Sequence, residues 1–260
     1  MADLSLIRDT STIRRAAPAF VVAWLAAVGA ARADPADAAA AAAVAVQAVE
    51  LIGGGRARVQ DCSGALIEPD LVLTSGHCLD GASDPSRVAV FAYRDGKPAP
   101  QPIIAAAFSR HPSHVVGWRK TPGDPETRQR EIASDLALIR LSAPVPGAAP
   151  LGFGTLAGAT GGAAGTGGAG PASRSGAMKR VALASVRAST GSGARVVFAS
   201  ADKTVCGGDS GGPAVGTDGR LWGVVAAVLK PRGGCGPRIA ITPVDPASEE
   251  FRRMRAGLGR

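Results

Sequence analysis

Short apolar runs broken by turn-forming residues repeat along most of the chain, and this pattern restricts the fold more than any other feature. Runs of this length between turns are typical of β-strands. Glycine and proline supply the breaks, since 35 Gly and 19 Pro make up about a fifth of the 260 residues. That share argues against a helical bundle. The candidate strands cover residues 59–67, 71–74, 88–93, 103–108 and 136–141 in the first half, and 181–186, 194–199, 213–215, 221–229 and 239–241 in the second.

The candidate strands fall into two groups, and the chain ends in a predicted helix. Residues 144–150 separate the groups as a linker. In the last stretch, 246–260, acidic side chains come early and arginines late, which suits the dipole of a helix. We therefore expect an all-β fold of two antiparallel barrels, one over about 51–145 and one over about 151–245, followed by a C-terminal helix.

Three stretches lack the strand pattern. Residues 34–50 are rich in alanine and are expected to be a pro-segment or spacer, with an isolated helix as the alternative. Residues 110–130 are polar and are expected to have no regular structure. Residues 152–170, rich in glycine and alanine, do not end in the Gly-Lys-Ser/Thr of a phosphate loop, so we expect a surface loop.

Residues 1–33 have the pattern of a secretory signal peptide. Three arginines precede an apolar run over 16–31, and residues 31–33 (Ala-Arg-Ala) form a small-x-small cleavage site before Asp34. The run is shorter than the ~20 residues that span a bilayer, although a short membrane anchor is the alternative. The four cysteines, Cys62, Cys78, Cys206 and Cys235, agree with export, because an even number predicts two disulfide bonds. Their spacings do not fit zinc, and sequence alone leaves three connectivities open.

The strongest chemical motif is residues 208–213 (Gly-Asp-Ser-Gly-Gly-Pro), with Ser210 as a candidate nucleophile. This motif also fits the G-x-S-x-G elbow of another hydrolase fold, which needs a histidine after its serine. The histidines here, His77, His111 and His114, all precede Ser210, so the elbow is excluded for a triad enzyme. His111 and His114 form an H-x-x-H pair without an obvious third ligand, and we expect them in a surface loop.

A serine hydroxyl needs a nearby base that is itself oriented by a carboxylate. His77 follows the apolar run 71–74 and Asp135 precedes the apolar run 136–141. Both side chains would therefore stand at strand ends, where two barrels could bring them together. The order His77, Asp135, Ser210 matches one of the known orders of a catalytic triad.

These three motifs together resemble the chymotrypsin/trypsin family of serine proteases, and the resemblance covers residues 51 to about 250. It implies two six-stranded antiparallel barrels with the site between them. It also implies that Ser210 attacks the scissile carbonyl, that His77 carries the proton and that Asp135 orients the imidazole. The backbone N–H groups of Gly208 and Ser210 would form the oxyanion hole.

The resemblance further implies the disulfide pairs Cys62–Cys78 and Cys206–Cys235. It places Thr204, Ala226 and Val228 in the substrate pocket. Thr204 is neutral and Val228 would narrow the pocket, which favours small or medium apolar residues. A preference for acidic residues is the alternative, with Arg232 or Arg238 pointing toward substrate.

Family members are often activated by a cut that frees an Ile-Val-Gly-Gly-like amine to pair with the Asp beside the nucleophile. Residues 51–54 (Leu-Ile-Gly-Gly) have that pattern, with a cut after Glu50, and Asp209 is the matching carboxylate. Some bacterial relatives need no cut, and Asp209 would then be satisfied by local N–H groups.

We expect a secreted or periplasmic serine endopeptidase that acts on proteins or peptides. It is expected to be a monomer without a stable membrane anchor, cofactor or metal. The net charge of +8 is spread along the chain, so nucleic acid is not an expected partner. Two alternatives are a catalytically inactive binding protein of the same fold and an esterase-like hydrolase. The intact set of three residues argues against the inactive protein.

Overall fold

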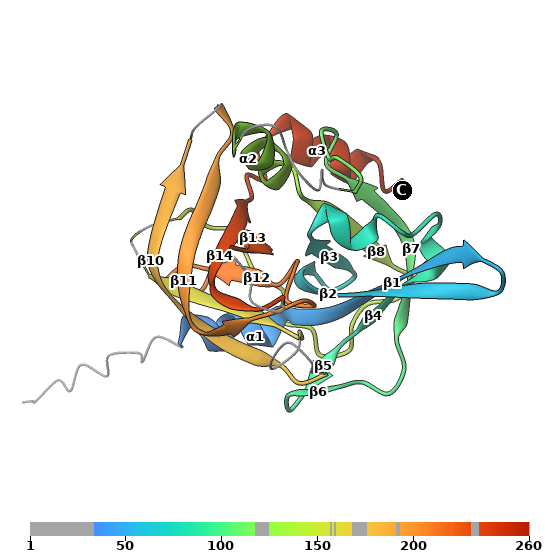
Figure 1. Cartoon of the computed structure of the whole chain (residues 1–260). Helices are drawn as coiled ribbons and strands as arrows, with labels where there is room; N and C mark the ends of the chain where they lie inside the picture. Colours follow the sequence, from blue (N-terminus) through green and yellow to red (C-terminus); the bar gives the residue numbers. More distant parts are fainter. Residues whose placement is uncertain are drawn as a thin grey trace, which may run out of the picture. The chain divides into compact units, whose positions relative to one another are not determined.

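The structure is a computed structural model that describes residues 34–117, 125–156, 158, 160–167, 176–190, 193–229 and 234–259. Within these residues, strands form two closed antiparallel barrels (Figure 1). The expected all-β fold of two six-stranded barrels with a C-terminal helix is confirmed. The expected signal peptide and Arg232 lie outside the described residues.

The first barrel has the strand order β1-β2-β3-β8-β7-β4. Its strands are β1 Ala43–Gly53, β2 Arg56–Glu68, β3 Leu71–Thr74, β4 Val88–Phe91, β7 Ile103–Arg110 and β8 Ala137–Leu141. A separate pair, β5 Tyr93–Arg94 and β6 Lys97–Pro98, and two short 3₁₀ helices, η1 Gly76–Leu79 and η2 Pro85–Arg87, connect these strands. Strand β3 is buried along its whole length, so the chain leaving it starts from a rigid position.

The second barrel has the order β10-β11-β14-β13-β12-β9. Its strands are β9 Gly161–Gly165, β10 Lys179–Ser189, β11 Val196–Val205, β12 Pro213–Val215, β13 Leu221–Val228 and β14 Gly236–Pro243. Three α-helices complete the described chain: α1 Pro35–Ala42, α2 Pro125–Ala133 and α3 Glu249–Ala256. In Figure 1, α2 and α3 lie at the same end of the barrels and α1 at the opposite end.

The C-terminal helix α3 forms where the charge pattern predicts it. Ser248 caps the helix, with its side chain accepting a hydrogen bond from Phe251 N at 3.2 Å. Phe251 and Met254 are buried in the larger hydrophobic cluster, which also contains the interior of the first barrel. The helix therefore closes one end of that core rather than standing free.

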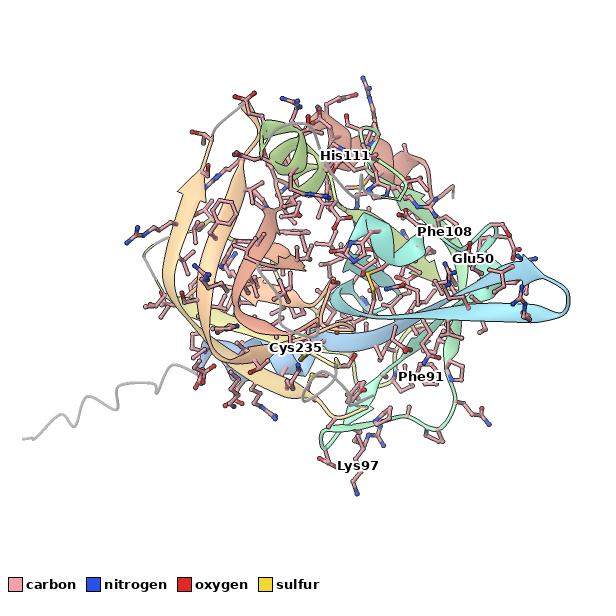
Figure 2. The ribbon with its side chains drawn as sticks, in the orientation of Figure 1. Glu50, Phe91, Lys97, Phe108, His111 and Cys235 are labelled. Atoms are coloured by element: carbon pink, nitrogen blue, oxygen red, sulfur yellow. A yellow bond between two sulfur atoms is a disulfide. The ribbon has the colours of Figure 1, made fainter. Side chains whose placement is uncertain are left out.

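The domain boundary expected at Leu51 falls inside a strand of the structure. Residues 43–53 are strand β1, and Val46 on this strand lies opposite both Cys62 of β2 and Val90 of β4. Glu50, the residue before the expected cut, is part of the same strand (Figure 2). A pro-segment removed after Glu50 would take away most of the strand that closes the first barrel. The sequence signal that could have identified the strand is the period-two spacing of Val44, Val46 and Ala48, which are the residues that the structure buries.

Two further stretches also differ from expectation. Residues 161–165, expected in a surface loop, are the mostly buried strand β9. A Cβ atom at Gly162 would collide with the backbone of Ala36 in α1, so glycine at this position lets the helix pack closely on the strand. In the polar stretch 110–130, the described residues from Pro125 onward belong to helix α2, whose Thr127 and Ile132 are buried.

Candidate active site

His77 and Asp135 meet at the ends of two paired strands of the first barrel. β3 pairs with β8, so the residues that follow β3 and precede β8 lie close together. His77 Nδ1 is 2.7 Å from Asp135 Oδ2, and the backbone N–H of His77 donates to Asp135 Oδ1 at 2.8 Å. Asp135 is fully buried, whereas the His77 side chain retains 21% exposure. The carboxylate thus holds the imidazole in one orientation and leaves it reachable.

The electrostatic setting of His77 favours its protonated form. Burial alone lowers the pKa of His77, but the charge of Asp135 and its hydrogen bond raise it, and the charge of Asp80 adds to this. The net result is a pKa above the ordinary value. His77 can therefore hold a proton temporarily, which a general base must do.

The loop that carries Ser210 has a backbone that needs glycine. Gly208 has φ +93° and Gly211 has φ +84°, a region that residues with a Cβ rarely adopt. A Cβ at Gly211 would also collide with the side chain of Thr74 and the carbonyl of Ser63. The turn is held by Gly211 N donating to Val225 O at 2.6 Å and Gly212 N donating to Asp209 O at 3.1 Å.

Ser63, on β2 of the first barrel, fixes this loop of the second barrel. Its N–H donates to Ser210 O at 2.7 Å and its hydroxyl donates to Gly208 O at 2.8 Å. Thr166 N in turn donates to Ser63 Oγ at 2.9 Å. Both loop carbonyls thus point toward β2. Within the described part of the chain, the N–H groups of Gly208 and Ser210 donate to no acceptor. Ser63 lies within β2 and Thr166 just after β9, and neither belongs to a motif that could be identified from sequence.

The Cys62–Cys78 disulfide lies between the two loops. Cys78 Sγ is 3.9 Å from His77 Nε2 and 3.7 Å from the carbonyl oxygen of Ser210. Ser210 and His77 are therefore neighbours across the junction of the barrels. The second disulfide joins Cys206 to Cys235, so both pairings implied by the resemblance are present. The one cluster of possible metal ligands among the described residues is Cys62, His77 and Cys78, whose two sulfur atoms are bonded to each other.

Asp209 is buried beside Ser210 and already has a cation. Its carboxylate accepts hydrogen bonds from Cys206 N and Gly167 N, both at 2.8 Å, and forms an ion pair with Lys179 of β10. Burial raises the pKa of Asp209, and Lys179 and the two amides offset this only partly. The residues expected to provide a new amine, 51–54, instead form the end of the β1–β2 hairpin, where Leu51 and Ile52 are exposed.

The expected pocket residues lie on β11 and β13. Thr204 is exposed and its carbonyl accepts a hydrogen bond from Lys179 at 3.3 Å. Ala226 is buried in an apolar cluster with Ile132 and other residues, whereas Val228 is half-buried. Arg238, considered for acidic substrates, is exposed on β14. The assignment of these residues to a substrate pocket stays a prediction.

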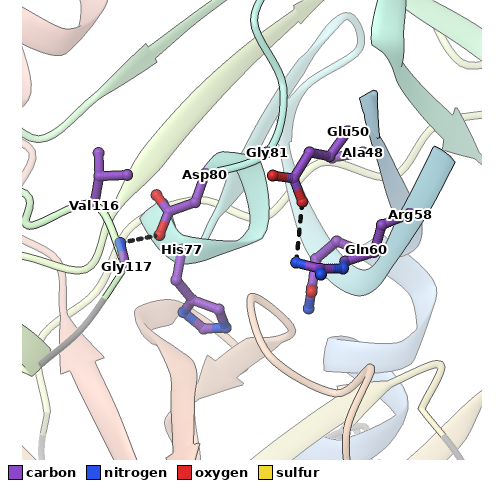
Figure 3. Close-up of a pocket in the computed structure, with 9 residues that line it drawn as sticks. All are labelled: Ala48, Glu50, Arg58, Gln60, His77, Asp80, Gly81, Val116 and Gly117. Carbon is purple, nitrogen blue, oxygen red and sulfur yellow. Dashed lines mark hydrogen bonds and ion pairs between the residues drawn. The ribbon is translucent and has the colours of Figure 1, made fainter. Parts of the chain in front are cut away.

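Two cavities flank the site on the side of the β1–β2 hairpin. One of about 510 Å³ lies beside His77 (Figure 3). Its lining includes the Glu50–Arg58 ion pair, at 3.1 Å, and Asp80, which accepts a hydrogen bond from Gly117 N at 2.8 Å. The other cavity, of about 620 Å³, is lined by Gly207, Gly208, Cys62 and Thr166 among others. The proposed nucleophile loop is thus reachable from open space on this side.

His114 lies in the loop after β7, but its side chain is buried at the site. Its side chain is 2% exposed, and its Nε2 is 2.8 Å from Asp80 Oδ1. His111 is only partly buried, and its Nδ1 accepts a hydrogen bond from Ser113 N at 3.1 Å. Sequence alone could not place His114 beside Asp80 and Asp135, because these contacts depend on how the loop after β7 folds over η1.

Comparison with known families agrees with this geometry. A family model described as Trypsin matches residues 37–249. The chain belongs to the trypsin family. The trypsin-like match begins inside the segment that the sequence suggested as a pro-segment, which agrees with the place of β1 in the barrel. No curated protein matches the chain.

Solved structures of trypsin-like proteins share the fold. The Rv3671c protease of M. tuberculosis in its active form has a TM-score of 0.54 and 21% identity, covering 99% of this chain and 95% of its own. The inactivated protease paralogue S-D1 of the scabies mite has a TM-score of 0.60 and 17% identity, covering 88% and 97%. Protease Anisep of Arthrobacter nicotinovorans has a TM-score of 0.57 and 15% identity, covering 84% and 96%. In the described part of this chain, no helix has both the length and the hydropathy needed to span a membrane.

Proposed function

We propose that the chain is an exported serine endopeptidase in which His77, Asp135 and Ser210 hydrolyse peptide bonds. The observation that carries the proposal is the His77–Asp135 contact of 2.7 Å, formed beside the glycine-rich loop that presents Ser210. Membership of the trypsin family implies protein or peptide substrates. Two disulfides suit an oxidising compartment and support export.

The reaction proceeds in two halves. Ser210 Oγ attacks the scissile carbonyl carbon while His77 Nε2 takes the hydroxyl proton, and the resulting tetrahedral intermediate collapses when His77 returns that proton to the leaving amine. Water then attacks the acyl-enzyme with His77 again accepting a proton, which passes back to Ser210 as the acid leaves. Asp135 stabilises the imidazolium formed in both halves.

The substrate carbonyl oxygen becomes negatively charged in the tetrahedral intermediate, so it needs hydrogen-bond donors directed at it. We assign this role to the N–H groups of Gly208 and Ser210. The contacts of Ser63 support the assignment, because they turn the carbonyls of these two residues toward β2.

We also propose that the substrate pocket, near Thr204 and Val228, prefers small or medium apolar side chains. A cleavage profile on a peptide library tests it.

Replacing the nucleophile tests the proposal directly. We expect Ser210→Ala to remove fluorophosphonate labelling and to lower casein hydrolysis on the order of 10⁴-fold or more, with an unchanged thermal midpoint. Ser142→Ala, at an exposed serine, is the matched control. A wild-type chain that is not labelled would support the inactive binding protein, and one that is labelled but cleaves only small esters would support the esterase.

A further inference from the structure

A second imidazole lies behind the Asp135 carboxylate. His114 Nε2 is 2.8 Å from Asp80 Oδ1, and His114 Nδ1 is 3.7 Å from Asp135 Oδ1. Both nitrogens of one buried ring thus face carboxylate oxygens. A ring nitrogen that carries a proton can donate to the carboxylate oxygen it faces.

The ring is held in place from several directions. The backbone N–H of His114 donates to His111 O at 2.8 Å, and Gly117 N donates to the second oxygen of Asp80 at 2.8 Å. A Cβ at Gly76 would lie 2.6 Å from His114 Nδ1, so glycine at this position lets the ring pack against the chain beside His77. Arg110 Nε, 3.9 Å from Asp80 Oδ1, is a further charge near the pair.

Asp135 is fully buried. Its Oδ2 contacts the imidazole of His77, and its Oδ1 accepts a hydrogen bond from the backbone N–H of His77 at 2.8 Å. His114 Nδ1, which faces the same Oδ1, is buried and has no hydrogen-bond partner among the described residues. A proton on this nitrogen points toward Asp135 Oδ1, and a small movement of either group closes the gap to a hydrogen bond.

We propose that His114 is a positioning residue for Asp135 and that Asp80 orients His114 in turn. The inference rests on the proposed protease function and extends it. The four side chains Asp80, His114, Asp135 and His77 form one continuous row of alternating carboxylates and imidazoles. Together with the backbone N–H of His77, this row limits rotation of the Asp135 carboxylate during proton transfer.

Two isosteric variants separate the two sides of the ring. His114→Asn keeps a donor at the position of Nδ1, facing Asp135, whereas His114→Gln keeps one near the position of Nε2, facing Asp80. His114→Leu removes both. Because displacement of a supporting group by about 1 Å can cost ~100-fold in rate, we expect Gln and Leu to lower kcat about 10- to 100-fold and Asn to stay within about threefold of wild type, all with KM nearly unchanged.

The orienting role of Asp80 is tested by a double-mutant cycle. Asp80→Ala should lower kcat by less than His114→Leu does, because the ring can still face Asp135. The double variant should be no slower than His114→Leu, because both substitutions weaken the same support. His111→Asn is the control, because this neighbouring histidine (Figure 2) is partly buried and its Nδ1 accepts a hydrogen bond from Ser113 N instead; it should keep the wild-type kcat.

A measurement that needs no turnover keeps the two proposals distinguishable. The low-field proton resonance of His77 Nδ1–H reports its hydrogen bond to Asp135, and it should move upfield or broaden in His114→Leu and His114→Gln but persist in His114→Asn. A folded His114→Leu with wild-type kcat and resonance overturns the positioning role. If that variant does not fold, equal kcat values for Asn and Gln overturn it. Absence of fluorophosphonate labelling in the wild type counts against the protease function instead.

Discussion

At the residue scale, His77 sets the pH dependence of the proposed reaction. Its ring must be neutral to accept the proton of Ser210, and Asp135 and Asp80 outweigh burial so that its pKa is raised. A raised pKa also means that the native chain binds this proton more tightly than the unfolded chain does. The resulting stability is fully present below the unfolded pKa and is lost as pH rises through the folded pKa, the range in which activity appears.

We therefore expect kcat/KM to rise with pH through a midpoint above the ordinary pKa of histidine. Asp135→Asn removes the largest of the groups that raise this pKa, so the midpoint should move to lower pH while the maximal rate falls. A pH profile of kcat/KM on one peptide substrate measures both. A flat wild-type profile between about pH 5 and 9 contradicts the role of His77.

Lys179 is a second charged residue on which the site depends, since its ammonium group faces the buried carboxylate of Asp209 beside Ser210. Lys179→Met keeps the length of the side chain and removes the cation. Because Asp209 would then be a buried charge without its partner, we expect the free energy of unfolding to fall by about 3 kcal/mol. The proteolytic activity of the protein should fall as well. Urea unfolding and casein turnover measure the two effects.

Lys203→Met, at an exposed lysine of β11, is the matched control for Lys179→Met. The pKa of Asp209 is already raised by burial, and without Lys179 it should rise further. The loss of activity in acid should then extend to higher pH in Lys179→Met. Wild-type stability and pH profile in that variant would mean that the ion pair does not order the loop.

The proposed catalytic residues could be proposed from sequence because each one has a local signature. His77 and Asp135 lie at the ends of apolar runs, and Ser210 lies in a glycine-rich motif, whereas the disulfide pairs followed only from the resemblance. Ser63, Lys179 and His114 were not predictable in the same way. Each acts on a residue that is distant along the sequence, so only the folded contacts reveal its partner.

At the element scale, strands β2 and β9 determine how closely the barrels approach each other. β2 supplies Ser63, which contacts the nucleophile loop and Thr166 just after β9. The strand β9 was missed because strand prediction depends on side chains that pack, and a glycine-alanine strand has almost none. Its burial comes from α1 and the neighbouring strands instead.

Ser63→Ala tests whether the contact from β2 matters for the reaction. The variant loses the donor to Gly208 O but keeps the backbone bond to Ser210 O. We expect kcat to fall about tenfold with KM little changed, because the loop loses its fixed orientation while the binding surface stays intact. Ser75→Ala is the control. It removes the hydrogen bond from the Ser75 hydroxyl to Val225 O, so its kcat shows how much of any loss follows from weakening another contact near the loop.

At the scale of the whole molecule, the position of β1 decides which N-terminus an active form can have. A chain that starts at Leu51 lacks α1 and most of β1, so the first barrel is left open. We expect this truncated chain to be insoluble or unfolded by circular dichroism, and a chain that starts at Asp34 to be active. N-terminal sequencing of the secreted active form checks the same point, and a start at Leu51 with full activity would refute it.

Helix α1 comes before the first barrel in the sequence but packs on β9, β10 and β12 of the second. Its Asp37 also forms an ion pair with Arg180 at 2.6 Å. The N-terminal helix α1 can therefore form these contacts only after most of the chain has been synthesised. Such contacts between distant parts of a sequence raise the contact order and slow folding. Because α1 couples the two barrels, we expect unfolding by urea to proceed as one cooperative transition for both.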